Sequence, residues 1–427
     1  MIKRLKVTGY KSLKDTEVFF EPLSVILGPN AAGKSNLLDG LNLLSRIVTS
    51  RNLKEAFENQ RGLPLESFYY GGEGYEKLLQ QDTAEIHFEV DVELSPNIVN
   101  SVEELIAEKR KGMDAEEKLK KRKVTERYLR YAATIQILPN TGHLRVIDER
   151  LSALKKNGEE KARRPFLEKA SISSPGKERL HLRMEGQAHP TYYDVGLDHS
   201  ILSMALYEPH YPHITAFRQE LSTWRFYYFE PRTLMREDVP AAEVEAIGPR
   251  GENLAAFLNL IQANDGGQME AFNLSLKYLL PSIDRIDINR TKEGLLSLRI
   301  VENGLSYSSR IISEGTLRVL GLLVALHPIS PTTVIGYEEP ENGVHPTRLK
   351  LVADLFKNTQ ELHDKQIIVN THSPVFPTYF DDRFLFVCRK EGANTKIISF
   401  KSEGLIFREG NIAKVLEERI LRGDYGG

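Results

Sequence analysis

The chain has 427 residues, of which 41% are hydrophobic and 27% are charged. These proportions are typical of globular proteins and exclude a mostly disordered or collagen-like chain. With 57 Lys and Arg residues against 59 Asp and Glu residues, the net charge is −2, which argues against a protein that binds nucleic acid over its whole surface. The single cysteine, Cys388, excludes an internal disulfide and a zinc cluster built from cysteines.

No segment is apolar enough to predict a membrane span. The longest purely apolar run is about eight residues, Val319–Leu326, whereas a membrane-spanning helix needs roughly 18. No apolar stretch of the kind found in a secretory signal occurs in the N-terminal residues MIKRLKVTGYKSL. We therefore expect a cytoplasmic protein without a membrane partner.

The N-terminal residues predict a strand, a loop and a helix in succession. Short strands are expected around Leu5–Val7 and Val18–Phe20, and the apolar residues Leu23–Leu27 predict a buried strand. The segment GPNAAG at 28–33 then forms a loop, because neither a strand nor a helix interior tolerates this composition. The helix that begins at about Lys34 has apolar residues at helical spacing, namely Leu37, Leu38, Leu41, Leu44 and Ile47.

Further along, a region of different composition interrupts the predicted strands. Residues 85–94 alternate with the period of a half-buried strand, and 131–138 with 143–148 indicate a hairpin. Two stretches, 101–130 and 155–177, are polar and charged. They indicate either a solvated helix and a surface loop or a surface that binds nucleic acid or a partner.

The basic cluster Lys118–Lys123 belongs to the first of these charged stretches.

From about Trp224 onward, strands and helices alternate, which predicts a parallel sheet with helices on its faces. Strands are expected at 226–229, 283–288, 295–301, 333–337, 366–370, 383–388 and 396–400, and helices at 252–262, 269–280, 314–327, 346–358 and 411–421.

The loop at 28–33 predicts a phosphate-binding function. Gly28 and Gly33, followed by Lys34 and Ser35, have the spacing of a Walker A motif between a strand and a helix. Glycines allow backbone N–H groups to surround a polyphosphate, and the helix N-terminus adds a favourable dipole. In this interpretation Lys34 neutralises the β- and γ-phosphates and the Ser35 hydroxyl binds Mg²⁺. We therefore expect ATP and Mg²⁺ as cofactors.

A second candidate site follows the apolar strand that ends at Tyr337. Glu338 and Glu339 lie at the carboxyl end of this strand, where α/β sheets bind ligands. Because neighbouring side chains of a strand point to opposite faces, one carboxylate can join the metal shell while the other orients the attacking water. The alternative is a strand followed by a solvated acidic loop.

Two further segments contain candidate residues. Ser313, Glu314 and Gly315 open an apolar helix whose start can present N–H groups and a hydroxyl to an anion, although a serine N-cap is common in helices of every function. His372 follows another apolar strand, and a histidine in such a position is more often structural than catalytic.

In their order, these motifs resemble those of ABC-type ATPase heads, and more narrowly the soluble branch related to RecF, SMC and OLD-family ATPases. The resemblance covers about residues 1–95 and 225–427. It rests on the Walker A loop and His372, and on the segments VTGYKSL at 7–13, ISEGTLR at 312–318, EEPENGVHP at 338–346 and LRGDYGG at 421–427.

This resemblance implies an α/β fold, with a parallel core sheet flanked by helices, an antiparallel β subdomain and a helical, charged insertion. The parts of the ATPase head would be 1–95 and 226–427, and the insertion would be 96–225. The implied nucleotide site comprises Lys11, Ser12, Asn30, Ala31, Ala32, Gly33, Lys34, Ser35 and Asn36.

Catalytic roles are also implied by the resemblance. Ser313, Glu314 and Gly315 would complete the nucleotide site of a second copy of the chain. Glu339 would act as the general base, and His372 would sense the γ-phosphate. Glu338 replaces the aspartate that is usual beside Mg²⁺, so the metal contact would be altered or indirect. The glutamine-bearing loop of such heads has two candidates, Gln60 and the stretch 70–74.

Three functions remain open from the sequence. The first is an ATPase subunit of a bacterial anti-phage system of the Septu or PARIS type, with a separate nuclease partner of the HNH or Toprim kind. The second is a RecF-like ATPase that binds DNA in repair, and the third is an ATP-gated scaffold with little hydrolysis. In each case we expect a homodimer or higher homo-oligomer, with DNA as a further candidate partner.

Two related classes are disfavoured. A transporter head has far fewer residues between the equivalents of Lys34 and Ser313. An OLD-type nuclease needs a Toprim domain after His372, and the residues that follow are too few for one.

Overall fold

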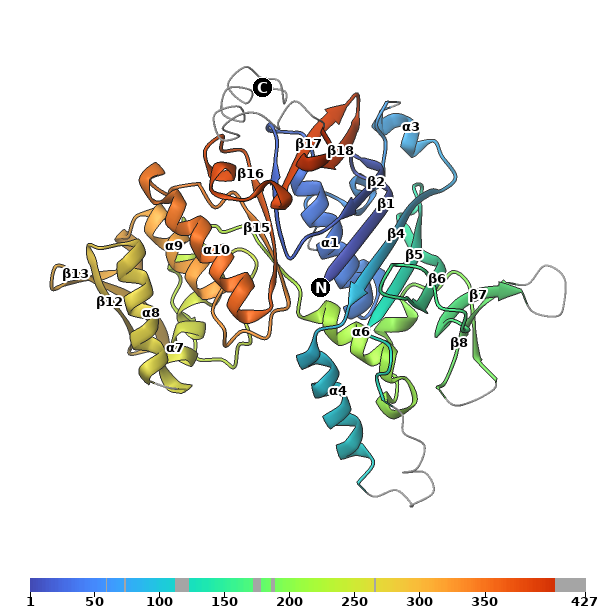
Figure 1. Ribbon diagram of the computed structural model, residues 1–427, viewed down its shortest axis with the longest axis horizontal. Coiled ribbons are helices and arrows are strands. Elements are labelled where there is room, and N and C mark those ends of the chain that lie inside the picture. The colour runs from blue at the N-terminus through green and yellow to red at the C-terminus, as the bar shows by residue number, and fades with distance from the viewer. Residues whose placement is uncertain are drawn as a thin grey trace. The chain divides into compact units, whose positions relative to one another are not determined.

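The computed structural model describes residues 1–58, 60–72, 74–111, 123–171, 178–185, 189–264 and 266–403 (Figure 1). The chain forms two compact units. The first consists of 1–21, 31–224 and 388–398, and the second of 22–30, 225–387 and the residues from 399 onward. The predicted insertion, 96–225, lies within the first unit apart from its last residue.

An antiparallel sheet of eight strands is the framework of the first unit, in the order β2-β1-β4-β5-β6-β7-β8-β9. Its alternating pattern buries one face, as Ile86, Phe88 and Val90 of β4 illustrate. The hairpin predicted from the sequence is confirmed and is longer than expected. The strands are β1 (Ile2–Tyr10), β2 (Leu13–Phe19), β4 (Ala84–Glu93), β5 (Tyr128–Leu138), β6 (His143–Ala153), β7 (Leu167–Ser171), β8 (Glu178–Leu182) and β9 (Thr191–Asp194).

The main helix of this unit is α1 (Lys34–Thr49), which buries the five apolar residues predicted from its spacing. It packs closely on the sheet, because the Cα of Gly40 faces the rings of Tyr10 and Phe88. It also contacts α6, which in turn contacts α4. The other helices are α2 (Leu53–Glu58), α3 (Tyr75–Leu79), α4 (Pro96–Lys109) and α6 (Pro212–Ser222).

The expected loop at 155–177 is wrong over part of its length. Residues 167–171 form β7, because Phe166 and Leu167 are buried and anchor the strand to the sheet. The charged stretch 101–130 begins in α4, which buries Ile98, Val102 and Ile106. Of the basic cluster Lys118–Lys123, only Lys123 lies within the described residues, and its Nζ is 3.7 Å from a carboxylate oxygen of Glu103.

The second unit contains the predicted parallel sheet, in the order β10-β15-β16-β3-β17. Every residue of β3, β15 and β16 is buried, as expected for strands covered by helices on both faces. The strands are β10 (Arg225–Tyr227), β15 (Val334–Glu338), β16 (Gln366–Thr371), β3 (Leu23–Leu27) and β17 (Leu385–Glu391), and β17 continues into the first unit, where β18 (Asn394–Ser399) follows it.

In its described part, the second unit also contains a smaller antiparallel sheet and the four helices α7–α10. Its strands are β11 (Val239–Pro240), β12 (Ile283–Arg290), β13 (Leu295–Glu302) and β14 (Leu305–Ser308). The helices are α7 (Leu254–Asn264), α8 (Gly266–Leu279), α9 (Glu314–Ala325) and α10 (Leu349–His363). The predicted helix at 411–421 lies outside the described residues.

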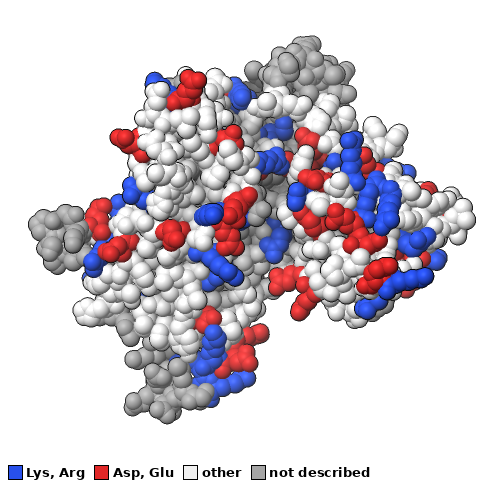
Figure 2. Space-filling model, turned by 180° about the vertical axis from the view of Figure 1, so that it is seen from behind, with Lys and Arg blue, Asp and Glu red and all other residues white. Residues whose placement is uncertain are grey.

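Within the described ranges, no helix is both long and apolar enough to cross a membrane. Figure 2 shows positive and negative side chains intermingled on the face that it views, as the near-zero net charge predicts.

Candidate functional site

The loop after β3 has a backbone that only a few residue types can adopt. Gly33, the N-cap of α1, has a φ of 102°, and Ala31 has a φ of 62° in the left-handed region. A Cβ atom at Gly33 would lie 2.0 Å from the Oγ1 atom of Thr395, so no other residue fits there. Strain of this kind is typical of ligand-binding loops.

The loop leads directly into a helix suited to bind an anion. α1 is 16 residues long and has no acidic residue in its first turn, so its N-terminal dipole is not neutralised locally. Lys34 is 6% exposed, and Ser35 is half-buried. This combination of strand, strained loop and helix is the geometry of a phosphate-binding loop.

Side chains from two distant segments support this loop. The Oγ1 of Thr395, on β18, donates to the carbonyl oxygen of Ala32 at 2.8 Å. The Oγ of Ser12 lies 2.6 Å from the same Oγ1, and the Nδ2 of Asn36 donates to Ser12 Oγ at 2.7 Å. The sequence predicted Ser12 and Asn36 as nucleotide contacts, and the structure places both side chains in this supporting network. Thr395 was missed, because no local pattern marks it.

Lys11 was also predicted to contact the nucleotide. Its φ is 46°, and its Nζ lies 2.8 Å from Oδ2 of Asp39 on α1. The Nε of Arg61 is 3.6 Å from the other oxygen of Asp39. Lys11 is therefore held against α1 by an ion pair. Gln60 accepts a hydrogen bond from the Tyr10 hydroxyl at 3.2 Å.

In the second unit, the acidic residues follow β15. Glu338 ends the strand and is buried, whereas the side chain of Glu339 is 32% exposed, so the two carboxylates have different surroundings, as predicted. Glu339 has a φ of 51°, and its N–H donates to the carbonyl oxygen of Asn370 at 2.9 Å. The Nδ2 of Asn342 donates to Oε2 of Glu339. A second strained residue thus lies at a predicted catalytic position.

His372 lies beside two of the glutamates. Its Nδ1 is 3.3 Å from Oε1 of Glu339 and 3.3 Å from Oε1 of Glu341. Glu341 also accepts hydrogen bonds from Thr371 Oγ1 at 2.7 Å and from the N–H groups of His372 and Ser373 at 2.9 and 3.0 Å. Its other oxygen, Oε2, is buried without a hydrogen-bond partner among the described residues.

Glu341 was not predicted as a site residue. Its signal was visible as the third acidic residue of Glu-Glu-Pro-Glu, but only the first two follow the strand directly. The structure shows that the side chain of Glu341 joins the acidic loop to the end of β16, beside the backbone hydrogen bond of Glu339.

The register of the parallel strands aligns these segments. Glu338 pairs with Asn370, and Asn370 pairs with Ile26, so β15, β16 and β3 end at the same edge of the sheet. The acidic loop, His372 and the first residues of the phosphate-binding loop, 28–30, all follow these ends. Ligands bind at this edge in α/β sheets, which accounts for the clustering of the motifs there.

The predicted signature residues open α9. Ser313 is exposed and is the N-cap, and its Oγ accepts a hydrogen bond from the N–H of Thr316 at 3.1 Å. Glu314 pairs with Arg232 at 2.8 Å. A Cβ atom at Gly315 would lie 2.0 Å from the carbonyl oxygen of Gly343, so the start of α9 packs backbone to backbone on the acidic loop.

The oxygen ligands of this site suit a metal ion that binds together with phosphate groups. No group of three or more His, Cys, Asp or Glu residues in the described part of the chain could hold a metal ion by itself. Mg²⁺ is commonly held by one or two protein oxygens together with phosphate oxygens. The carboxylates of Glu338, which ends β15, and Glu339, which follows it, supply oxygen atoms of this kind.

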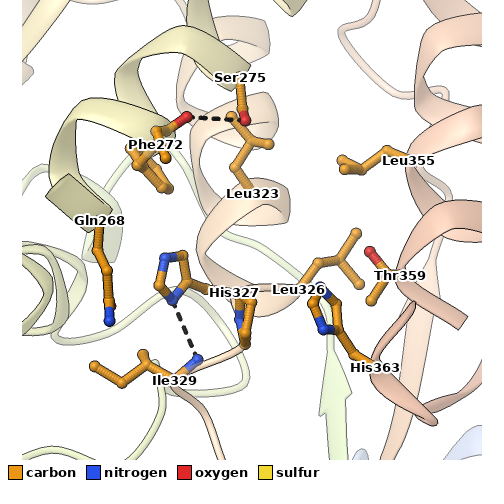
Figure 3. A pocket seen from close by; sticks show the side chains of 12 residues that line it. Gln268, Phe272, Ser275, Leu323, Leu326, His327, Ile329, Leu355, Thr359 and His363 are labelled. Atoms are coloured by element: carbon orange, nitrogen blue, oxygen red, sulfur yellow. Dashed lines mark hydrogen bonds between the residues drawn. The ribbon is translucent and has the colours of Figure 1, made fainter.

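A separate cavity of about 580 Å³ lies between α8, the end of α9 and α10 (Figure 3). The ring of His327 projects into it, and its Nδ1 accepts a hydrogen bond from the N–H of Ile329 at 3.3 Å. Burial lowers the pKa of His327 to about 4, so the ring is neutral at pH 7. None of the lining residues belongs to the motifs above.

Two protein families match parts of this chain. The family described as “AAA ATPase domain” matches residues 1–163, and the family described as “AAA domain, putative AbiEii toxin, Type IV TA system” matches residues 213–376. Together these matches support an ATPase with AAA-type domains.

A solved SMC head bound to the C-winged helix domain of ScpA superposes with a TM-score of 0.52, over 93% of this chain and 97% of that structure, at 12% sequence identity. The chain has the fold of an ABC-type ATPase head. This confirms the fold class predicted from the sequence, with its parallel core sheet and antiparallel β subdomain. The region 96–225 of this head contains five strands, β5–β9, in addition to α4 and α6.

Two curated proteins are similar to this ATPase head in sequence. An ATP/GTP phosphatase of Helicobacter pylori is 20% identical over 401 residues, which cover 89% of this chain and 88% of that protein. The chromosome partition protein Smc of Myxococcus xanthus is 33% identical over 92 residues, or 21% of this chain. That match spans only 7% of the length of the Smc protein.

Proposed function

We propose that this chain binds and hydrolyses ATP, and that two copies pair head to head around the nucleotide. The observation that carries this proposal is the common edge at which β3, β15 and β16 end, because it gathers a phosphate-binding loop, an acidic loop and a histidine. The family matches and the fold support the same activity.

In this proposal each motif has a separate role. Backbone N–H groups of the loop and the Lys34 ammonium bind the β- and γ-phosphates, with Asn30–Gly33 and Asn36 completing the loop. Ser35 would hold Mg²⁺, with Glu338 directly or indirectly beside it, and a bound Mg²⁺ would supply positive charge next to the phosphates. Lys11 and Ser12 stay close to the loop as part of its support.

Hydrolysis requires a positioned water and a sensor of the γ-phosphate. Glu339 accepts the proton of the attacking water, and its exposed side chain leaves room for that water. His372 donates a hydrogen bond to the γ-phosphate. The carboxylate of Glu341 fixes the position of this histidine, because it contacts both the Nδ1 atom and the backbone N–H of His372. Ser313, Glu314 and Gly315 of a second copy complete the site, since they lie at an exposed helix N-terminus.

Substitutions of single motif residues test this activity. Lys34→Ala should abolish binding of Mg-ATP in calorimetry, and Glu339→Gln should bind ATP but lose about 10²–10⁴ in hydrolysis rate. Lys54→Ala, on the exposed face of α2, is the matched control and should behave as wild type. Unchanged affinity for Mg-ATP in Lys34→Ala protein would refute the assignment of the loop.

For the biological role, we propose a sensor or regulatory subunit of an anti-phage system, with a separate nuclease of the HNH or Toprim kind. One matched family is described by a toxin and a type IV toxin–antitoxin system, which supports a role in a multi-protein response. The Smc match favours a second candidate, a DNA-binding ATPase of RecF-like function.

Nuclease assays and DNA-binding assays distinguish these roles. The purified chain is incubated with Mg²⁺ or Mn²⁺, ATP, and linear, nicked and single-stranded DNA. The first role predicts no cleavage by the chain alone, and the second predicts ATP-dependent binding to one of these DNA forms. Metal-dependent cleavage that co-elutes with the chain and persists in Glu339→Gln protein would contradict the separate nuclease.

A further inference from the structure

A single arginine side chain holds the segment that leads into α9. Arg236 ends a short 3-10 helix, Leu234–Arg236. Its guanidinium donates to four backbone carbonyls, those of Pro231 (from Nε, 2.7 Å), Ser309 (from Nη1, 2.8 Å), Arg310 (from Nη1, 2.6 Å) and Ile312 (from Nη2, 2.7 Å). The Oγ of Ser309 donates in return to the carbonyl oxygen of Arg236 at 3.1 Å. Three of these four residues, Ser309, Arg310 and Ile312, lie within the four positions before Ser313.

The charge of Arg236 is not matched by a carboxylate. Within the described residues Arg236 forms no ion pair, whereas its neighbours Arg232 and Arg310 pair with Glu314 and Asp238. Its guanidinium therefore adds positive charge close to the N-terminus of α9. A planar guanidinium presents five N–H donors in a fixed fork, and no other side chain can reach four carbonyls in this geometry.

The segment around Ser313 is held at two points along the chain, by Arg236 before Ser313 and by the contact between Gly315 and Gly343 after it. Ser313 itself is exposed and bonds only within its own helix turn, to Thr316. After it, Gly315 packs against Gly343. Before it lies the short 3-10 helix Ser309–Ile311, and the carbonyls of Ser309, Arg310 and Ile312 accept hydrogen bonds from Arg236. The ion pair between Arg310 and Asp238 also holds this segment, but Arg236 is the side chain that binds three of its carbonyls at once.

We propose that Arg236 is the positioning residue of the signature segment. It holds Ser313 and the first N–H groups of α9 in the conformation that receives the γ-phosphate bound by another copy of the chain. This inference rests on the function proposed above. Arg236 then acts on the nucleotide site of the partner copy, and the phosphate-binding loop of its own copy does not depend on it.

The test uses full-length protein with Arg236→Gln and Arg236→Lys. Gln cannot span the four carbonyls, and Lys restores the charge without the fork. Both variants should keep the wild-type affinity for a fluorescent ATP analogue at their own loop, while kcat falls by about 10²-fold, the usual cost of misplaced groups. Arg285→Gln, an exposed arginine of β12 that pairs with Asp287, is the control and should retain wild-type kcat.

Mixing experiments separate positioning from misfolding. Arg236→Gln protein has an intact loop and a defective signature, and Lys34→Ala protein has the reverse. In a random equimolar mixture, half of the dimers are mixed and each contains one intact site, so activity should rise above that of both parents, to at most about a quarter of wild type. Neither parent alone should reach that value.

Three results would overturn the inference. These are wild-type kcat in Arg236→Gln, full recovery in Arg236→Lys, and a mixture no more active than its parents while wild-type protein is active. If wild-type protein itself neither hydrolyses ATP nor pairs in its presence, the proposed function fails instead. Loss of nucleotide affinity in Arg236→Gln would also count against a role restricted to the partner's site.

Discussion

The Oγ1 atom of Thr395 lies 2.8 Å from the carbonyl oxygen of Ala32, although 363 positions separate the two residues in the sequence. The same oxygen occupies the space that a side chain at Gly33 would need. One threonine hydroxyl therefore both anchors the phosphate-binding loop and requires the glycine. The loop is therefore held by a residue of a strand that is distant in the sequence.

Replacing this hydroxyl by a methyl group should weaken the loop. Thr395→Val has nearly the same shape but leaves the buried carbonyl of Ala32 without its donor, at a cost of about 1–3 kcal/mol in unfolding free energy. Affinity for Mg-ATP should fall as well. Thr395→Ser keeps the hydroxyl and serves as the control, and both quantities are measured by urea unfolding and calorimetry. A Thr395→Val protein with wild-type stability and affinity would contradict this role.

The two glutamates beside His372 should respond differently to substitution. Glu341→Ala removes the acceptor of three hydrogen bonds, of which only that of the Ser373 N–H has a second acceptor, Thr371 Oγ1, and should lower the unfolding free energy by about 1.5–3 kcal/mol. Glu339→Ala, at a more exposed position, should lower it by less than about 0.5 kcal/mol. Both should lose ATP hydrolysis. Urea unfolding of the two variants checks the difference, and equal destabilisation would show that Glu341 is not the structural link between the loop and β16.

Lys365 makes the stability depend on pH in the alkaline range. Its ammonium is buried and donates to the carbonyl oxygens of His327 and Ser330 at 3.0 and 3.1 Å, and burial lowers its pKa from 10.5 to about 8. Between these values the unfolded chain binds more protons than the folded one, so stability should rise with pH. The slope is at most about 1.4 kcal/mol per pH unit.

Comparison with a variant isolates this contribution. The unfolding free energy of wild type minus that of Lys365→Met should increase from pH 8 to 10.5, in urea unfolding at fixed ionic strength. Lys350→Met, at an exposed position of α10, should give a flat difference. A flat difference for Lys365→Met as well would mean that the lysine is not desolvated.

Cys388 should be unreactive in the folded protein. Its thiol is buried beneath the phosphate-binding loop, 3.6 Å from the carbonyl oxygen of Ala32, and burial raises its pKa to about 12. Because the thiolate is the reactive species, alkylation by iodoacetamide at pH 8 should be slow in buffer and fast in urea. Mass spectrometry of the labelled chain measures both rates. Fast labelling of native protein would show that the loop opens frequently.

The core of this fold could be predicted from short-range patterns. The continuous apolar residues of Leu23–Leu27 and the helical spacing of α1 are local properties, and the glycines between them admit few conformations. The same holds for β15 and β16, whose apolar residues are followed by acidic and histidine residues. The common edge of the sheet then brought these motifs together as the alternation of strands and helices predicted.

Residues that act through distant contacts could not be predicted. Thr395 is an ordinary strand residue until the chain folds, and Arg236 lies outside every motif, in a segment without periodicity. In the same way, β7 depends on Phe166 and Leu167 packing onto a sheet whose other strands lie elsewhere in the sequence. Pairing partners of this kind are a property of the tertiary fold.

The close approach of Gly315 and Gly343 has a consequence for how a pair of these chains would use ATP. The backbone of the signature helix rests directly on the acidic loop, with no side chain between them to absorb a displacement. If Glu339 moved towards a nucleotide in its own copy, α9 would move with it, and in the pair proposed above the neighbour's site would receive a displaced signature segment. The two nucleotide sites of a pair would then be positively cooperative. The hydrolysis rate would rise with ATP concentration with a Hill coefficient above 1.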